Sequence, residues 1–209
     1  VVGRQENDAL PQILFPGVIG LVVDHAGSYV PKERLSTLDL GTGNRFPTPK
    51  SRHAEVKDLI AYLALINNPN DDLRLRRIIN TPRRGIGDKS IQIAEALAQE
   101  EGCQLLEFLR RAKRYTAISS ATANQMVNFV YMMDNFREAA ASLKPSELIE
   151  LVAEESGYNK MLSEMTDLTE RDNRMNNVGE LVSAARIYEE GTETPSLVEF
   201  LEDVALVSD

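Results

Sequence analysis

The sequence predicts a mainly α-helical protein, a multi-helix domain that contains a helix-hairpin-helix-like element and follows an irregular or small β N-terminal segment. From residue 54 onward, apolar residues recur every three or four positions, the spacing that places them on one face of a helix. The first 53 residues lack this spacing and hold five of the nine prolines, a residue that interrupts helices. We therefore divide the chain into an N-terminal segment, 1–53, and an all-helical domain, 54–209.

Within the N-terminal segment, two short apolar runs, ILF at 13–15 and VIGLVV at 18–23, flank Pro16 and Gly17. A Pro-Gly pair between β-rich runs favours a small hairpin. The run GTGNRFPTPK at 41–50 is typical of a linker.

In the helical domain, prolines, glycines and capping residues divide the apolar pattern into helices. The first predicted helix begins at Ala54 and is stopped by Asn68-Pro69, because a residue that precedes proline is pushed out of the helical conformation. A short helix capped by Asp71 or Asp72 follows, and another begins at 88 or 89 and closes at Gly102. Further helices are predicted at 104–114, 121–143, 145–156, 158–165, 169–190 and 196–207.

The net charge of −9 is unevenly distributed. Residues 145–209 carry sixteen acidic and four basic residues, whereas the other 144 carry sixteen acidic and nineteen basic ones. A polyanion responds to the local field, which salt screens within about 10 Å, rather than to the total charge. The acidic total therefore does not exclude DNA as a partner. Six basic residues gather within 74–89, opposed by Asp88 alone: Arg74, Arg76, Arg77, Arg83, Arg84 and Lys89.

Composition argues against several other classes of protein. No run approaches the roughly 18 apolar residues that span a bilayer, and the first residues do not resemble a signal peptide. Cys103 is the single cysteine, so we expect no disulfide framework and a cytoplasmic location. The only other residues typical of zinc sites are His25 and His53, so no metal site is expected.

The stretch TPRRGIGDKS, 81–90, is the most informative segment, and a nucleotide-binding loop is the first reading to test. A P-loop requires Gly-x-x-x-x-Gly-Lys-Ser/Thr after a buried strand. Here Asp88 separates Gly87 from Lys89, and an arginine-rich helix precedes the segment. We therefore do not expect it to bind a nucleotide.

A tight turn between two helices explains the same residues better. Gly85 or Gly87 can adopt positive φ, and neither holds a phosphodiester away from the backbone amides. Ile86 is expected to point inward, and the amides of 85–89 then lie at a helix N-terminus, which attracts anions. Such contacts recognise phosphate rather than bases, so binding would be independent of sequence and sensitive to salt. The alternative is a plain helix–helix connection with solvated arginines.

The segment EVKDLIAYLALINNPNDDLRLRRIINTPRRGIGDKSI, 55–91, resembles the UvrD/PcrA/Rep branch of superfamily 1 DNA helicases. The resemblance continues at 148–162, 174–190 and 196–209, in the order of the family's 2B domain, an all-helical insertion in the second motor domain. In the family, the sequence VVGG is followed within a residue or two by RFF, just before this domain. Here Val1-Val2-Gly3 and Arg45-Phe46 are separated by residues 4–44, which match no part of the family.

This resemblance implies the accessory 2B domain of an ATP-dependent 3′-to-5′ DNA helicase, in which a Gly-Ile-Gly hairpin grips duplex or fork DNA and the domain swivels to regulate unwinding. Its partners would be DNA, independent of sequence, and the motor domains of the same polypeptide. ATP and Mg²⁺ would be cofactors of the parent helicase and none would bind this fragment. Carried over by position, the DNA-binding residues are Thr81, Arg83, Arg84, Gly85, Ile86, Gly87 and Lys89, with Arg76 and Arg77 as candidate additional contacts.

No catalytic residue is predicted, because the sequence shows no Walker A lysine, no Walker B acidic pair and no later arginine finger motif. The fragment itself is therefore not expected to hydrolyse ATP. A second hypothesis stays open: a helical protein-interaction or autoregulatory domain that docks through its acidic C-terminal face and has no DNA affinity of its own.

Overall fold

The computed structural model describes residues 21–23, 29–31 and 54–208, and the chain divides into two units, Val1–Pro49 and Lys50–Asp209. In the first unit, β1 (Leu21–Val23) pairs antiparallel with β2 (Tyr29–Pro31), with Val22 opposite Val30. Residues 21–23 of the predicted strand thus pair with a β-favouring Tyr-Val run that the sequence analysis overlooked. The run 13–15 and the predicted turn at 16–17 lie outside the described residues.

The second unit is helical throughout its described part, which confirms the predicted fold class. Its elements are α2 (Ala54–Asn67), α3 (Asp72–Ile78), α4 (Asp88–Glu101), α5 (Leu105–Arg110), the 3₁₀ helix η1 (Ala112–Arg114), α6 (Ser120–Ala140), α7 (Pro145–Glu155), α8 (Tyr158–Ser163), α9 (Leu168–Glu190) and α10 (Leu197–Ser208). Among these, no helix is both long enough and apolar enough to cross a membrane.

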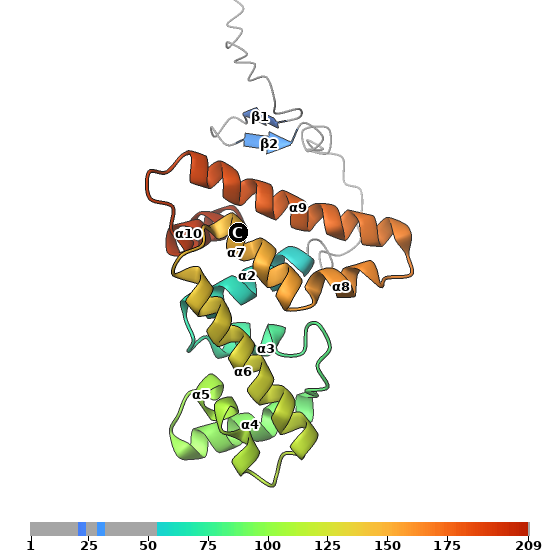
Figure 1. Ribbon diagram of the computed structural model, residues 1–209, viewed down its shortest axis with the longest axis vertical. Helices are drawn as coiled ribbons and strands as arrows, with labels where there is room; N and C mark the ends of the chain where they lie inside the picture. The colour runs from blue at the N-terminus through green and yellow to red at the C-terminus, as the bar shows by residue number, and fades with distance from the viewer. Residues whose placement is uncertain (1–20, 24–28, 32–53, 209) are drawn as a thin grey trace, which may run out of the picture. The chain divides into compact units, whose positions relative to one another are not determined.

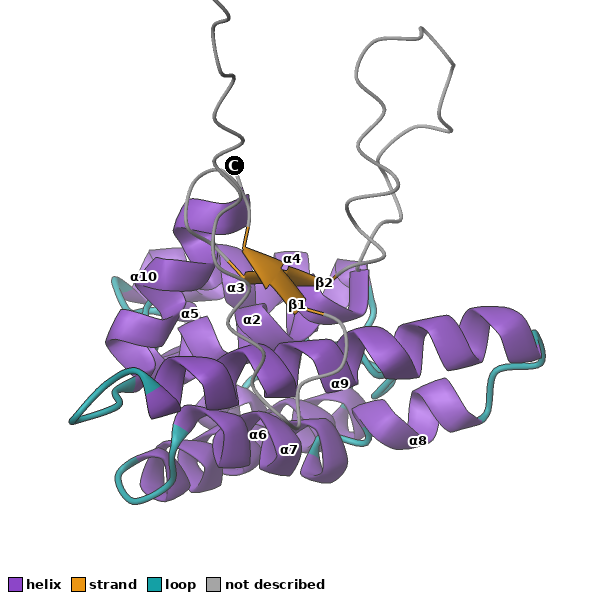
Figure 2. Cartoon of the chain, turned by 90° about the horizontal axis from the view of Figure 1, so that it is seen from above, coloured by secondary structure: helices purple, strands orange, loops and turns teal. Residues whose placement is uncertain are grey.

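Helix α6 connects two groups of helices in this unit (Figure 1). At one end it packs on α2 and α7, which in turn contact α9, while α10 lies against α2. At the other end α5 and η1 pack on α6, and α4 packs on α5. Helices α8 and α9 lie side by side along one edge, as Figure 2 shows from above.

The core follows the predicted 3-and-4 spacing of apolar residues. Along α6, the buried side chains include Met126, Phe129, Val130, Met133 and Phe136, so Met126 and Met133 are packing residues. Tyr62 of α2 meets Phe136 edge to face, with ring centroids 6.5 Å apart. This contact packs α2 against α6. Helix α3, which follows α2 along the chain, therefore starts from a fixed position.

Two predicted helices are shorter in the structure. The helix expected at 104–114 is interrupted at Arg111, whose N–H donates to the carbonyl of Phe108 at 2.8 Å and tightens the chain into η1. The helix expected to reach 143 ends at Ala140, because Pro145 must open the next helix from an extended residue, Lys144.

A partly buried polar cluster joins α2, α3 and α8. The carboxylate of Asp58, 9% exposed, accepts a hydrogen bond from the Tyr158 hydroxyl at 2.6 Å and pairs with Arg77 Nη2 at 2.8 Å. Burial, followed by this hydrogen bond to Asp58, raises the pKa of Tyr158 well above its usual value. Burial also raises the pKa of Tyr62.

These shifts predict a loss of stability in alkaline solution. A tyrosine whose pKa is raised by folding contributes its full stability below the unfolded value of about 10, and that stability declines as the pH rises beyond it. We expect the free energy of unfolding, measured in urea from pH 8 to 11, to fall above about pH 10. Tyr158→Phe should flatten this decline, whereas Tyr131→Phe, at an exposed tyrosine, should leave it unchanged. Identical curves for the wild type and Tyr158→Phe would contradict the prediction.

Candidate nucleic-acid interface

A nine-residue hairpin, 79–87, joins α3 to α4. Helix α3 begins after Asp71, whose side chain accepts a hydrogen bond from Arg74 N at 2.9 Å, and it ends at Ile78. Helix α4 begins at Asp88, after Gly87 as its N-cap. The order of a short helix, a connection that contains Gly85 and Gly87, and a second helix from residue 88 thus agrees with the expected boundaries.

The side chain of Asn80 closes the hairpin. Its Oδ1 accepts hydrogen bonds from Arg84 N at 2.8 Å and from Ile86 N at 3.3 Å. The Ile86 side chain is fully buried in the core, as predicted. Sequence reasoning missed Asn80, although the tendency of asparagine to hold nearby backbone N–H groups offered a signal.

The two glycines have different conformations. Gly85 has φ 75°, in the left-handed region that favours glycine, whereas Gly87 has φ −80° and ψ 159°, which other residues also adopt. A Cβ atom added to either glycine would have no neighbouring atom within 4 Å. The turn therefore needs a glycine at 85, and both positions face open space.

Four exposed residues present the amide cluster, which we define as the backbone N–H groups of Gly85, Gly87, Asp88 and Lys89. No acceptor for these N–H groups is found in the described part of the chain, whereas the N–H of Ile86 is used by Asn80. The last two open the first turn of α4, where unpaired N–H groups and the helix dipole favour an anion. The carboxylate of Asp88 opposes this effect in part.

Two predicted cations accompany the amide cluster. Arg83 and Lys89 are exposed, and neither side chain has an ion-pair or hydrogen-bond partner among residues 54–204. Thr81 is half-buried, and its carbonyl accepts the Tyr62 hydroxyl at 2.6 Å. Arg83 and Lys89 are therefore free to approach a phosphate, while Thr81 helps to hold the hairpin.

The other arginines of this basic segment have internal partners. Arg76 forms a bidentate ion pair with Glu95 of α4, and Arg77 pairs with Asp58 of α2. These pairs hold α3 against α4 and α2. Contacts from Arg76 and Arg77 to DNA stay a prediction, and such contacts would compete with the pairs.

The structure places Arg84 differently from the expected phosphate contact. Its guanidinium is turned into the molecule, where it lies 5.9 Å from the Tyr62 ring centroid and 5.4 Å from that of Phe129. It donates to oxygen atoms of Ile78, Ile79, Pro82, Tyr62 and Ser156. Adjacent arginines in the sequence thus have different roles, since Arg83 is exposed and Arg84 is bonded internally.

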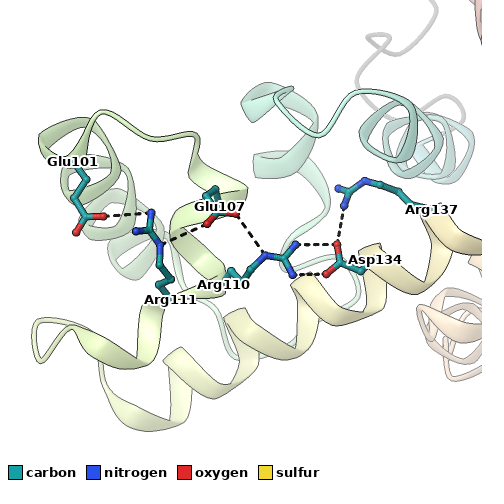
Figure 3. A network of polar contacts seen from close by, with 6 residues as sticks. All are labelled: Glu101, Glu107, Arg110, Arg111, Asp134 and Arg137. Atoms are coloured by element: carbon teal, nitrogen blue, oxygen red, sulfur yellow. Dashed lines mark hydrogen bonds and ion pairs between the residues drawn. The ribbon is translucent and has the colours of Figure 1, made fainter.

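In a second basic cluster, 110–114, Arg110 and Arg111 are also paired. Figure 3 shows a row of alternating charges that runs from Glu101 through Arg111, Glu107, Arg110 and Asp134 to Arg137. Arg110 contacts both oxygens of Asp134, at 2.5 and 3.0 Å, and this hydrogen bonding raises its pKa. Burial lowers the pKa of Arg137. The row joins α4 and α5 to α6, so Arg110 and Arg111 form ion pairs between these elements.

The sequence of the hairpin departs from the P-loop pattern. Asp88 places a carboxylate beside the amide cluster, at the point where a P-loop has a lysine. In the described residues, no three His, Cys, Asp or Glu side chains gather where they could hold a metal ion.

Comparison with known proteins gives a consistent match over the helical unit. The sequence profile described as the UvrD-like helicase C-terminal domain matches residues 51–209. Over 157 residues, 74% of this chain, the sequence is 35% identical to an ATP-dependent DNA helicase PcrA of Staphylococcus epidermidis and 34% identical to one of Staphylococcus aureus. The match covers 21% of each relative, so the chain spans about a fifth of the length of these proteins.

The glycine conformations predict unequal effects of substitution on stability. Gly85→Ala places a residue with a Cβ atom in the left-handed backbone conformation. It should therefore lower the free energy of unfolding by about 1 kcal/mol. Gly87→Ser keeps an allowed conformation and a good N-cap residue, so its effect should stay within about 0.5 kcal/mol. Urea denaturation monitored by circular dichroism measures both values. Equal losses for the two variants would contradict the assigned backbone conformations.

Proposed function

This chain belongs to the UvrD-like helicase C-terminal domain family, and we propose that it acts as the accessory 2B domain of an ATP-dependent 3′-to-5′ DNA helicase. In this proposal, hairpin 79–87 and the first turn of α4 bind the backbone of duplex DNA near the fork. The family membership supports the helicase context. The local geometry supports the hairpin as the element that binds.

The amide cluster is the observation that carries the proposal. Four N–H groups of exposed residues, for which the described part of the chain supplies no acceptor, lie on consecutive or nearly consecutive residues, near the exposed side chains of Arg83 and Lys89. Phosphate oxygens accept such N–H groups and pair with such cations. Because the missing Cβ atoms of Gly85 and Gly87 leave open space, a sugar-phosphate chain can approach the backbone closely.

Contacts of this kind read phosphate and not bases. Backbone N–H groups at a helix N-terminus bind phosphate oxygens, which every nucleotide carries, and in that position they contact no base edge. The proposed partner is therefore duplex or fork DNA of any sequence.

The motor activity is proposed for the parent protein. The relatives named above are ATP-dependent DNA helicases, and this chain corresponds to about a fifth of their length. ATP and Mg²⁺ would bind to motor domains elsewhere in the same polypeptide. Those motor domains are the second proposed partner of this chain, which would regulate unwinding through its orientation.

A second candidate function has its own supporting observation. Leu168 and Met175, 59% and 45% exposed, lie seven residues apart on α9 and hence on one side of that helix. They belong to the acidic C-terminal part of the chain, 145–209. A helical interaction or autoregulatory domain without DNA affinity would use such a face.

A salt titration separates these candidates. We expect the 209-residue chain to bind a fluorescein-labelled hairpin duplex with a single-stranded tail, and the affinity to fall linearly with salt on logarithmic axes. Arg83→Ala and Lys89→Ala should each reduce the slope by about 1. Fluorescence anisotropy at several salt concentrations provides the measurement.

Arg186→Ala is the matched control for this titration. It removes one exposed arginine from α9, where Arg186 pairs with Glu150 at 2.6 Å, and should leave the slope unchanged. A wild-type chain whose anisotropy shows no binding at any salt concentration would support the interaction domain instead.

The open space at Gly87 gives an independent prediction. Gly87→Asp keeps a good N-cap residue but adds a carboxylate beside the amide cluster, where it repels phosphate and competes for the N–H groups. We expect about tenfold weaker DNA binding or more, with little change in stability. Gly87→Ser, which adds an uncharged side chain, should lose less affinity. Wild-type affinity in Gly87→Asp would place the DNA elsewhere on the protein.

A further inference from the structure

We infer that Arg84 is a positioning residue, whose guanidinium fixes hairpin 79–87 on the helical core so that the amide cluster is presented ready to receive a phosphate. This inference rests on the proposed function, because it concerns the same hairpin. It assigns to Arg84 a role different from the direct phosphate contact that its place in the sequence indicates.

One side of the guanidinium holds the start of the hairpin. Nη1 donates to the carbonyls of Ile78 at 3.0 Å, Ile79 at 3.4 Å and Pro82 at 3.2 Å. The first two belong to the end of α3, where carbonyls lack partners within the helix. Arg84 therefore satisfies the end of α3 and fixes the direction in which the chain leaves it.

The other side of the guanidinium reaches helices that are distant in the sequence. Nη2 donates to the Tyr62 hydroxyl at 2.7 Å and to the carbonyl of Ser156 at 3.0 Å. Tyr62 lies in α2, and Ser156 is the C-cap of α7, 72 residues from Arg84. One planar group thus joins the hairpin to α2, α3 and α7.

The electrostatics favour arginine at this position. The printed acceptors of the guanidinium are five uncharged oxygens and the sulfur of Met132, 3.9 Å from Nη2. Three of the oxygens lie at the C-terminal ends of α3 and α7, where the helix dipole is negative. A planar fork with five donors matches several fixed oxygens, whereas a lysine ammonium has only three donors on one point. A phosphate contact by Arg84 would require these bonds to break.

The backbone of Arg84 is held as firmly as its side chain. Its N–H and that of Ile86 both donate to Asn80 Oδ1, so both residues beside Gly85 are fixed. A hairpin without these anchors would have to be ordered by the DNA itself, which weakens binding without removing any phosphate contact. Positioning therefore predicts lower affinity with an unchanged salt slope.

Two neighbouring arginines allow a matched test in the whole 209-residue chain. Arg84→Lys keeps the charge but loses the fork, and should bind the labelled hairpin duplex about tenfold more weakly with the wild-type salt slope. Arg83→Lys makes the same exchange at an exposed residue and should stay within about twofold, because a lysine also pairs with phosphate. Tyr62→Phe changes no charge and should weaken binding in the same direction as Arg84→Lys. Circular dichroism and urea denaturation establish that each variant is folded under the binding conditions.

Hydrogen exchange supplies a measurement that does not depend on DNA. In Arg84→Lys the amide of Ile86 should exchange at least about tenfold faster, whereas the amide of Val130 in α6 should change much less. Equal acceleration at both amides would mean that Arg84 supports the fold as a whole and would overturn the inference.

The binding outcomes are equally decisive. Wild-type affinity in a folded Arg84→Lys variant, or no effect of Tyr62→Phe, would also overturn positioning. A wild-type chain that binds no duplex at any salt concentration would overturn the proposed function, and the exchange of the Ile86 amide then decides by itself whether Arg84 holds the hairpin.

Discussion

The carbonyl groups at the ends of α3 and α7 impose the constraint on which this part of the structure depends. The last carbonyls of a helix have no partner within it and must find one elsewhere when they are removed from water. Here one guanidinium, that of Arg84, serves both ends and also bonds to Tyr62. Because Arg84 lies within the hairpin that follows α3, the same bonds that complete the helices also fix that hairpin.

The basic segment 74–89 combines two kinds of arginine that composition cannot distinguish. Arg76 and Arg77 bind carboxylates of other helices, and Arg84 binds carbonyls. Only Arg83 and Lys89 are left exposed with no partner in the described part of the segment. Most of the positive charge thus holds the domain together, and the surface that is available to a polyanion depends on peptide N–H groups as well as on cations.

Much of the fold could be predicted from the sequence, because local signals mark its boundaries. Pro69, Gly102 and Pro145 end or begin helices for backbone reasons that operate within a few residues, and the structure agrees there. The family was also recognisable from the sequence, and the profile match confirms it. The interruption at Arg111 was not predicted, since the apolar pattern continues through it and a single backbone hydrogen bond decides the outcome.

The hairpin shows where such reasoning ends. Its glycines, its buried Ile86 and the start of α4 follow from local preferences. The inward orientation of Arg84 does not, because Arg83 and Arg84 are identical residues and the distinction depends on Ser156, 72 positions away. Tyr62 was missed for the same reason, as it acts through a contact that exists only after the helices have packed. Asn80 was missed although its bonds lie within the hairpin and follow from a local preference of asparagine.

The scarcity of unpaired cations beside the amide cluster has a consequence for motion along a nucleic acid. A contact with two unpaired cations, Arg83 and Lys89, displaces about two counterions, fewer than a site built from many lysines and arginines. Every phosphate of a regular duplex offers the same oxygens, and the next one along lies a few ångströms away. If the hairpin holds DNA as proposed, the duplex could shift from one phosphate to the next while it stays bound, and no single register would be favoured.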